Sequence, residues 1–453
     1  MRIVVIGIGK VGSTVAEYLA REGHEVVVVD RNPDVVDRMT SRYDVLGVCG
    51  NGVSVEVQKE AGISRANLVV AMTSSDEFNI LCGIIARKSG AGHVIARVRN
   101  PDYFRQMPFL QEQLGLSMAL NPEMEAADTI SRMLRFPSAA KLEVFAKGRL
   151  EMAEVTLPKD SVLDGVSLKD LPARLGAQVL VCAVQRGADV VIPNGTFVLK
   201  AGDHINVCAA HGDMNSFFKK MGLYQDSVRS VMIVGGGRIA FYLAPQLLRL
   251  GIRVKIVERD PQICRELSQL LPKAEILRGD GTDQEVLLEE GIRSADACVA
   301  LTGVDEENII VSMFARNQNV KKVITKVNRP NLLSIMHSVG IESVVSPRSV
   351  TGDRVVRYVR AINNSRGSSI QTLYRLLDGR MEALEFEVGR SADFTGKTLQ
   401  ALTFRKGVLI AAIVRDGKLI HPQGSDCMLP GDRVTVVTTL SGLQDLSDTL
   451  VRD

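Results

Sequence analysis

Apolar runs of strand length alternate with helical patterns in the first part of the chain. The run from Ile3 to Gly7 leads into a helical stretch from Val11 to Arg21, and Glu25 to Asp30 is the next strand-like run. The alternation continues up to a helix that is expected from Pro101. Because parallel strands need crossover connections, which are usually helices, this rhythm predicts an α/β domain with a parallel sheet and helices on both of its faces.

The pattern changes further along the chain. From Leu142 onward apolar and polar residues alternate with a period of two, and turn sequences such as Ile192-Pro193-Asn194-Gly195 interrupt the alternation. Period-two alternation between glycine and proline turns is typical of short antiparallel strands. We therefore expect a small β-rich domain to follow the α/β domain.

Both patterns occur twice. The opening IVVIGIGKVG returns from Ser230 as SVMIVGGGRIA, and TSSDEFN (Thr73 to Asn79) returns as TGVDEEN (Thr302 to Asn308). An internal duplication of this length predicts the same pair of domains in each half. We expect two Rossmann-like, doubly wound parallel-sheet domains (1–123 and 229–348), a crossover helix or linker after each (124–141 and 349–368), and then a small β-rich α+β domain (142–226 and 369–453).

A glycine-rich sequence, Gly7-Ile8-Gly9-Lys10-Val11-Gly12, joins the first strand to the first helix. In a G-x-G-x-x-G turn the first glycine permits the tight turn, the second lets the backbone approach a pyrophosphate at the helix N-terminus, and the third allows close packing of helix and strand. Asp30 ends the second strand, where a carboxylate accepts hydrogen bonds from ribose hydroxyls and disfavours a 2′-phosphate. This context predicts a dinucleotide site.

The second copy carries the related sequence Gly235-Gly236-Gly237-Arg238-Ile239-Ala240, with Glu258 in the acidic position. Ligands of such sheets bind outside the carboxyl ends of the strands, so the loops after later strands complete each site. These loop residues are Thr73, Ser74 and Arg97 in the first copy and Thr302, Gly303 and Lys326 in the second. Arg97 and Lys326 match in position and carry a charge that suits a phosphate, although a salt bridge at a strand end is an equal alternative.

Composition and motifs speak against several classes of protein. The 55 basic side chains nearly balance the 52 acidic ones, which is too even for a chain that holds nucleic acid by neutralising its phosphates. The sequence has no serine-hydrolase, zinc-protease or P-loop motif and no CxxC or His–Cys cluster, and its β-rich domains offer no catalytic constellation. We therefore expect neither catalytic residues nor a metal site, and we favour nucleotide sensing over nucleotide chemistry.

The helix expected from Pro122 has one apolar face, formed by Ala126, Ala127, Ile130 and Leu134. Since the parallel sheet already has helices on both faces, this helix needs another neighbour. We expect a symmetric homo-oligomer, a dimer of dimers, built through such helices. No apolar run approaches the roughly 18 residues of a membrane span, and the N-terminus lacks the pattern of a signal peptide.

These motifs resemble those of the TrkA family, the cytosolic regulatory subunits of bacterial potassium transporters. The resemblance covers the whole chain and rests on GIGKVG followed by Asp30, on AMTSSDEFN, on ARVRNPDY, and on the twice-repeated order of α/β and β-rich domains. In that family the α/β modules are RCK N-terminal domains and the β-rich modules are RCK C-terminal domains, where RCK stands for regulator of K⁺ conductance.

The resemblance implies a cytoplasmic regulatory subunit that gates a membrane-embedded, Trk-type potassium-translocating subunit and lies at the inner face of the cell membrane through this partner. It implies NAD⁺ or NADH as ligands, with ATP or ADP as further candidates. The implied site residues are Gly7, Ile8, Gly9, Lys10, Val11, Asp30, Thr73, Ser74 and Arg97 in the first copy and Gly235, Gly236, Gly237, Arg238, Ile239, Glu258, Thr302, Gly303 and Lys326 in the second. The alternatives are an NAD-dependent oxidoreductase and a regulatory ring of another cation channel or antiporter.

The two copies differ at two positions of the implied sites. Asn51 stands where the second copy has Asp280, and Gly303 stands where the first has Ser74. The first site therefore has one negative charge fewer, and the second has one hydroxyl donor fewer. We expect the two sites to prefer different nucleotides.

Overall fold

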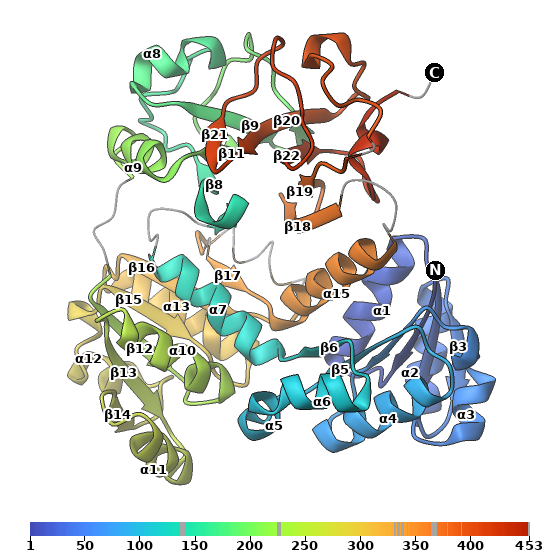
Figure 1. Ribbon diagram of the computed structural model, residues 1–453. Coiled ribbons are helices and arrows are strands. Elements are labelled where there is room, and N and C mark those ends of the chain that lie inside the picture. The colour runs from blue at the N-terminus through green and yellow to red at the C-terminus, as the bar shows by residue number, and fades with distance from the viewer. Residues whose placement is uncertain are drawn as a thin grey trace. The chain divides into compact units, whose positions relative to one another are not determined.

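The computed structural model describes residues 1–135, 141–223, 228–329, 332, 336, 339–341, 343–363, 369–377, 379–390 and 392–451. The chain forms two compact units (Figure 1), one made of Met1–Ser131 and Arg229–Val359 and the other of Arg132–Val228 and Arg360–Asp453. Each half of the duplicated sequence thus contributes one domain to each unit. The domain limits expected at residues 226, 368 and 453 lie outside the described residues.

The first α/β domain begins with β1 and ends with the long helix α7. Its elements are β1 (Arg2–Ile6), α1 (Lys10–Arg21), β2 (Glu25–Asp30), α2 (Pro33–Arg42), β3 (Leu46–Cys49), α3 (Val55–Glu60), the short 3-10 helix η1 (Ile63–Arg65), β4 (Leu68–Ala71), α4 (Asp76–Lys88), β5 (His93–Arg97), α5 (Pro101–Arg105), α6 (Met107–Leu114), β6 (Met118–Leu120) and α7 (Pro122–Arg135).

The second α/β domain repeats this order. Its elements are β12 (Ser230–Val234), α10 (Arg238–Arg249), β13 (Arg253–Glu258), α11 (Pro261–Leu270), β14 (Glu275–Arg278), α12 (Gln284–Glu289), η4 (Ile292–Ser294), β15 (Ala297–Ala300), α13 (Asp305–Asn317), β16 (Lys322–Lys326), β17 (Val344–Val345) and α15 (Pro347–Asn363).

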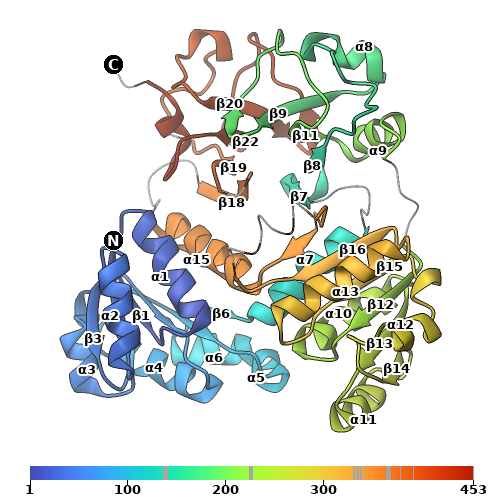
Figure 2. The same cartoon turned by 180° about the vertical axis from the view of Figure 1, so that it is seen from behind.

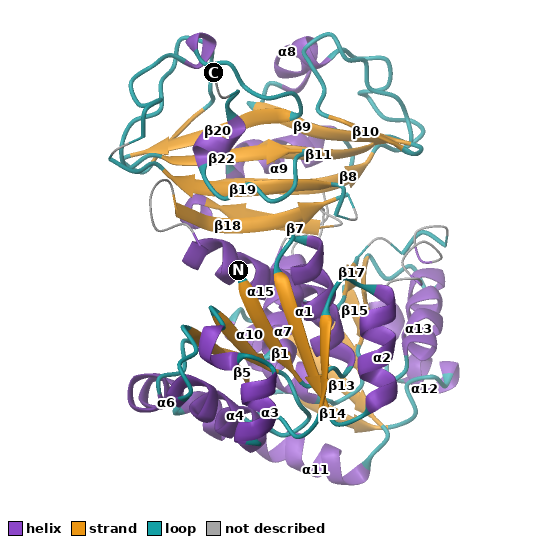
Figure 3. Ribbon diagram, turned by 90° about the vertical axis from the view of Figure 1, so that its right-hand side faces the viewer, coloured by secondary structure: helices purple, strands orange, loops and turns teal. Residues whose placement is uncertain are grey.

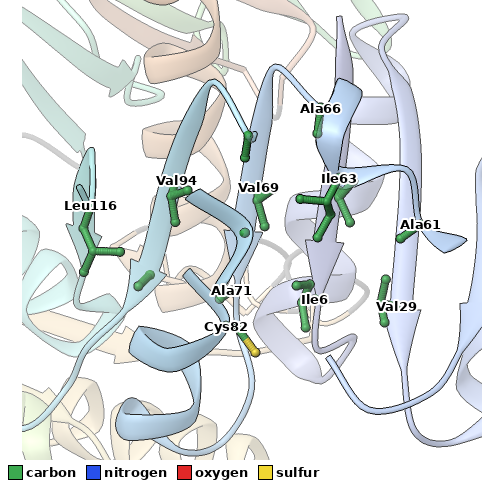
Figure 4. Packing of buried hydrophobic residues seen from close by; sticks show 14 of the residues in the cluster. Ile6, Val29, Ala61, Ile63, Ala66, Val69, Ala71, Cys82, Val94 and Leu116 are labelled. Atoms are coloured by element: carbon green, nitrogen blue, oxygen red, sulfur yellow. The ribbon is translucent and has the colours of Figure 1, made fainter. Parts of the chain in front are cut away.

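Each α/β domain contains a six-stranded parallel sheet. The strand orders are β3-β2-β1-β4-β5-β6 and β14-β13-β12-β15-β16-β17, so the order reverses beside β1 and beside β12. The central strands are mostly apolar because helices cover both faces, and side chains such as Ile6, Val69 and Val94 are buried between the sheet and its helices (Figure 4). The predicted fold class is confirmed, although the short edge strands β6 and β17 were not expected.

The last helix of each α/β domain packs on the other α/β domain (Figures 1 and 2). On α7, Asp128 accepts a hydrogen bond from Gln246 of α10 at 2.6 Å. On α15, the Tyr358 hydroxyl lies 3.0 Å from Nδ1 of His93 at the start of β5, and Gly352 lies against the Tyr18 ring of α1. The two domains therefore exchange helices within one chain.

This exchange of helices corrects the expectation that the apolar face of α7 packs against another chain. The apolar face of α7, formed by Ala126, Ala127, Ile130 and Leu134, is at most 1% exposed in the single chain. The neighbour that this face needs is thus the second α/β domain, and the face is not available to another chain.

The second unit consists of two antiparallel sheets, drawn in orange in Figure 3. One has the order β10-β9-β11-β8-β7 and the other β18-β19-β22-β20-β21, and apolar side chains from both, including Met152 and Met381, share one core. The elements of the first β-rich domain are β7 (Lys141–Phe145), η2 (Ala146–Gly148), β8 (Leu150–Thr156), η3 (Leu168–Asp170), α8 (Leu171–Leu175), β9 (Val179–Arg186), β10 (Asp189–Val191), β11 (His204–Ala209) and α9 (His211–Lys220). Those of the second are β18 (Ser369–Leu376), β19 (Met381–Glu387), η6 (Leu399–Ala401), β20 (Val408–Arg415), β21 (Lys418–Ile420), β22 (Arg433–Thr438) and η7 (Leu446–Thr449).

Close packing of α15 on α1 makes Gly352 sensitive to substitution. A Cβ atom at this position would lie 2.6 Å from Cδ2 of Tyr18. We expect Gly352→Leu to lower the free energy of unfolding by about 1–3 kcal/mol, the usual effect of overpacking, in chemical denaturation. Gly212→Leu in α9 is the matched control, because a Cβ there meets nothing within 4 Å. Equal losses in the two variants, or no recovery when Tyr18→Ala is added to Gly352→Leu, would contradict the exchange of helices.

Candidate nucleotide-binding sites

The carboxylate that ends β2 holds the glycine loop of the first site. Asp30 Oδ2 accepts a hydrogen bond from the Ile8 amide at 2.7 Å, and Oδ1 accepts from the Asn32 amide at 3.0 Å. Gly7 adopts a φ of 89°, and a Cβ atom there would lie 2.7 Å from the Thr73 amide nitrogen. The loop between β1 and α1 is therefore fixed on one side by Asp30 and pressed on the other against the end of β4.

The second site repeats this geometry. Glu258 Oε2 accepts from the Gly236 amide at 2.6 Å, and Oε1 accepts from the Asp260 amide at 2.8 Å. Gly235 has a φ of 104° and lies against the backbone of Thr302. The longer glutamate thus reaches the same loop position as the aspartate, so the predicted pairing of glycine loop and acidic residue is present in both copies.

The helices that follow the two glycine loops begin without a side-chain cap. Gly9 and Gly237 are the N-cap residues of α1 and α10, and neither N-terminus receives a hydrogen bond from a capping side chain. By contrast, Ser75 caps α4 and Asp260 caps α11. A Cβ atom at Gly9 or Gly237 would meet no described atom within 4 Å. The free amide groups of both helices therefore face open space, and this arrangement fits a phosphate or pyrophosphate.

A buried asparagine shapes each loop after the fourth strand. Asn79 Oδ1 accepts from the Thr73 amide at 2.7 Å, and Asn308 Oδ1 accepts from the Thr302 amide at the same distance. The amide nitrogens of the two asparagines donate at 3.0 Å to the carbonyl oxygens of Arg97 and Lys326, respectively. Both asparagines are fully buried. Both asparagines lie in the repeated sequence TSSDEFN and TGVDEEN, but the sequence alone does not predict their role.

Arg97 lies at the end of β5 and donates through Nη2 to the carbonyl oxygen of Thr73. Its Nε atom is buried and has no hydrogen-bond partner among the described residues. Burial lowers the pKa of Arg97, the charge of Arg99 lowers it further, and Arg238 of the second domain acts in the same direction. Arg97 is thus a half-buried cation whose Nε lacks a partner among the described residues, which is the environment that an anionic ligand would satisfy.

Lys326 occupies the matching place in the second site. Its Nζ donates to the carbonyl oxygen of Thr302 at 2.6 Å. Burial is the main cause that lowers the pKa of Lys326, and Lys10 of the first domain lowers it as well, whereas Asp305 and Glu123 raise it. Each strand-end cation therefore lies within electrostatic reach of the other domain's glycine loop, so the two sites face each other.

Residues of α7 and α10 lie between the two sites. The Tyr242 hydroxyl donates to the carbonyl oxygen of Arg99 at 2.7 Å and accepts from Nδ2 of Asn121 at 3.0 Å. Glu123 Oε2 is buried without a hydrogen-bond partner among the described residues. Glu123 and Tyr242 were not singled out from the sequence, because only the exchange of helices brings them to the sites.

The other predicted residues lie on the same two loops. Ile8 and Ile239 are buried, so at these positions only the backbone is available to a ligand. Lys10, Ser74, Arg238 and Gly303 are exposed and Val11 is half-buried. The structure thus brings all the predicted residues of each copy to the carboxyl edge of one sheet. Within the described ranges, no three His, Cys, Asp or Glu side chains gather as metal ligands would, and no helix is long and apolar enough to cross a membrane.

The family comparisons cover most of the chain. The TrkA-N domain family matches residues 3–122 and 231–347, and the TrkA-C domain family matches residues 152–222 and 383–451. The Trk system potassium uptake protein TrkA homolog 1 of Methanosarcina mazei is 32% identical over 98% of this chain and 99% of its own length. The homolog of Archaeoglobus fulgidus is also 32% identical, over 99% of both chains. TrkA of Haemophilus influenzae is 28% identical over 96% of this chain and 95% of its own length.

Solved structures show the same fold. The GsuK RCK domain is 18% identical, with a TM-score of 0.60 over 97% of this chain and 93% of that one. The GsuK channel bound to NAD is 19% identical, with a TM-score of 0.61 over 99% of this chain and 78% of that one. The arrangement of two α/β and two β-rich domains is therefore shared with proteins of distant sequence.

Two glycines of the first loop have different roles, because Gly9 leaves space for a ligand and Gly12 is needed for stable folding. We expect Gly9→Leu to fold like the unmodified protein, because the side chain would enter open space, and to lose NADH binding, because that space is where a phosphate would lie. Gly12→Ala should instead destabilise the domain, since its Cβ would lie 2.0 Å from the Gly7 carbonyl oxygen. Both variants are made with Gly237→Leu, which silences the second site, and are compared by calorimetric titration and thermal unfolding. Full NADH affinity in a folded Gly9→Leu protein would exclude this loop from the site.

Proposed function

Because the chain belongs to the TrkA family of potassium uptake proteins, we propose that it is the cytosolic, nucleotide-binding regulatory subunit of a potassium uptake system. In this proposal it acts on a membrane-embedded potassium-translocating subunit and performs no chemical reaction of its own. Membership of this family supports the assignment to a potassium uptake system. The observation that carries the regulatory role is the pair of facing glycine-loop sites, each with a half-buried cation at a strand end.

The proposed ligands are adenine dinucleotides, NAD⁺ or NADH, with ADP or ATP as alternatives. Asp30 and Glu258 each stand where a ribose is held, and the uncapped N-termini of α1 and α10 suit the diphosphate. Solved RCK channel structures of the same fold are described as bound to NAD and to ADP. These likenesses support the class of ligand, and we propose that each of the two sites of this chain binds one such nucleotide.

Regulation would follow from the facing sites. An anion bound beside Arg97 also lies near Arg238, and an anion beside Lys326 also lies near Lys10. Such a ligand binds better when the two α/β domains are close together than when they are apart. Because a ligand shifts a conformational equilibrium only through such a difference in affinity, nucleotide binding would favour one arrangement of the domains. The helices α7 and α15, which lead from these domains toward the second unit in sequence, would carry the change.

We propose that the homo-oligomer forms through a surface other than α7. Leu81 of α4 and Ile310 of α13 occupy the same position in the two copies and are 47% and 55% exposed, and Met313 beside Ile310 is 45% exposed. Exposed apolar side chains that recur at equivalent places suit self-association of a duplicated chain. We therefore place the contact between chains on α4 and α13.

Potassium uptake tests the proposed role directly. In cells that lack this chain we expect slower uptake at low external K⁺ and recovery with the unmodified protein. The purified protein should bind NADH without oxidising it, measured by titration and by absorbance with common hydride acceptors. A variant with Gly9→Leu and Gly237→Leu should restore uptake that no longer responds to nucleotide. NADH turnover, or uptake that is the same with and without the chain, would argue for the oxidoreductase or for another transport system.

Charged residues at the proposed contact should separate the chains. We expect Leu81→Asp combined with Ile310→Asp to reduce the mass measured by light scattering from that of a tetramer to that of a single chain. Val191→Asp in β10 is the control, because Val191 is also exposed but lies in a β-rich domain. A single-chain mass for the unmodified protein at micromolar concentration would contradict self-association, and an unchanged mass in the double variant would place the contact elsewhere.

A further inference from the structure

Arg31, the residue after Asp30, links three elements at the mouth of the first site. Its Nη2 donates to Oδ1 of Asn51, in the loop after β3, at 2.9 Å. Its guanidinium carbon lies 4.9 Å from the centre of the Phe78 ring, in the first turn of α4. Asn51 Oδ1 also accepts from the Val53 amide at 3.3 Å, so the amide that holds Arg31 is itself held by its own loop.

We propose that Arg31, Asn51 and Phe78, together called the Arg31 clamp, form the platform on which the adenine base of a nucleotide stacks in the first site. This inference rests on the proposed function and specifies how that site recognises its ligand. The diphosphate lies at the glycine loop and the ribose at Asp30. The base is attached to the ribose, so it extends from Asp30 away from the glycine loop, toward Arg31 and the end of β3.

The clamp has the properties that stacking requires. A guanidinium group is planar and stacks on aromatic rings. The guanidinium group lies over the Phe78 ring, and Arg31 is exposed, so a base can reach it from the solvent. The hydrogen bond to Asn51 fixes the plane before the ligand arrives, which reduces the entropy that would be lost on binding.

The second site lacks this clamp. Arg259 follows Glu258, but Glu307 stands in the place of Phe78 and Asp280 in the place of Asn51. Asp280 Oδ1 accepts from the amide and the hydroxyl of Thr282 at 2.9 and 2.7 Å. These hydrogen bonds lower the pKa of Asp280, and the charge of Arg259 adds to the effect. Arg259 therefore lies near the carboxylate of Asp280, and Glu307 offers no aromatic ring at the position that matches Phe78, so the base should contribute less to binding in this copy.

Removing the ring while keeping its apolar contacts tests the clamp. Phe78 packs against the core of the first domain, so Phe78→Leu retains the apolar cover of α4. The variant is made with Gly237→Leu, so that only the first site is measured by calorimetry. The probes are ADP and inorganic pyrophosphate. We expect ADP affinity to fall about ten-fold, the usual scale of base stacking, and pyrophosphate affinity to remain unchanged.

Two further variants separate stacking from charge and from position. Arg31→Lys keeps the positive charge but removes the planar guanidinium group. It should therefore lower the affinity for ADP as Phe78→Leu does and leave the affinity for pyrophosphate unchanged. Glu307→Leu, measured with Gly9→Leu so that only the second site binds, is the matched control and should leave ADP affinity unchanged.

The outcomes distinguish the clamp from the proposed function. Unchanged ADP affinity in both Phe78→Leu and Arg31→Lys would overturn the clamp while nucleotide binding stands. An equal loss of affinity for ADP and for pyrophosphate would also overturn the clamp, since Phe78 would then only support the loop. If the unmodified protein binds neither probe nor NADH, the proposed function fails and the clamp fails with it.

Discussion

The exchange of helices between the two α/β domains determines the rest of the first unit. The apolar face of α7 cannot remain in water, and within the single chain it is buried beside α10, while α15 is packed in the same way beside α1. This reciprocal packing turns the carboxyl edges of the two sheets toward each other. As a consequence, each glycine loop carries its cation, Lys10 or Arg238, toward the strand-end cation of the opposite domain.

The local parts of the fold could be predicted from the sequence, because the rules behind them are local. A glycine with positive φ, an acidic residue at a strand end and apolar runs of strand length are read from a few neighbouring residues, as Gly7 and Asp30 illustrate. The strands β6 and β17 were missed because they are only three and two residues long and lie at sheet edges. The partner of α7 was assigned to another chain, because an apolar helix face shows that it needs a neighbour without showing which one.

The sites were predictable in their backbone and less so in their side chains. Asp30 was expected to bind a ribose, yet in the structure both of its oxygens accept from backbone amides, so its first role is to hold the loop. Asn79 was not predicted because a buried asparagine has no sequence pattern of its own; of its partners, Thr73 lies in the loop after β4 and Arg97 ends β5. Glu123 belongs to the site only through tertiary packing, which no spacing along the chain reveals.

The two copies share the residues that shape the glycine loop and differ in the residues at the mouth of the site. Residues that shape the loop match in kind, as Gly7 matches Gly235 and Asn79 matches Asn308. Residues at the mouth differ, as Phe78 differs from Glu307. Two unlike sites that share one field of facing cations cannot be filled independently of each other's charge, since an anion in either one relieves repulsion felt in both. By linkage, whatever the first ligand does to the affinity of the second site, the second ligand does equally to the first. In the proposed function, the asymmetry of the copies would therefore let two different nucleotide signals act on one arrangement of the α/β domains.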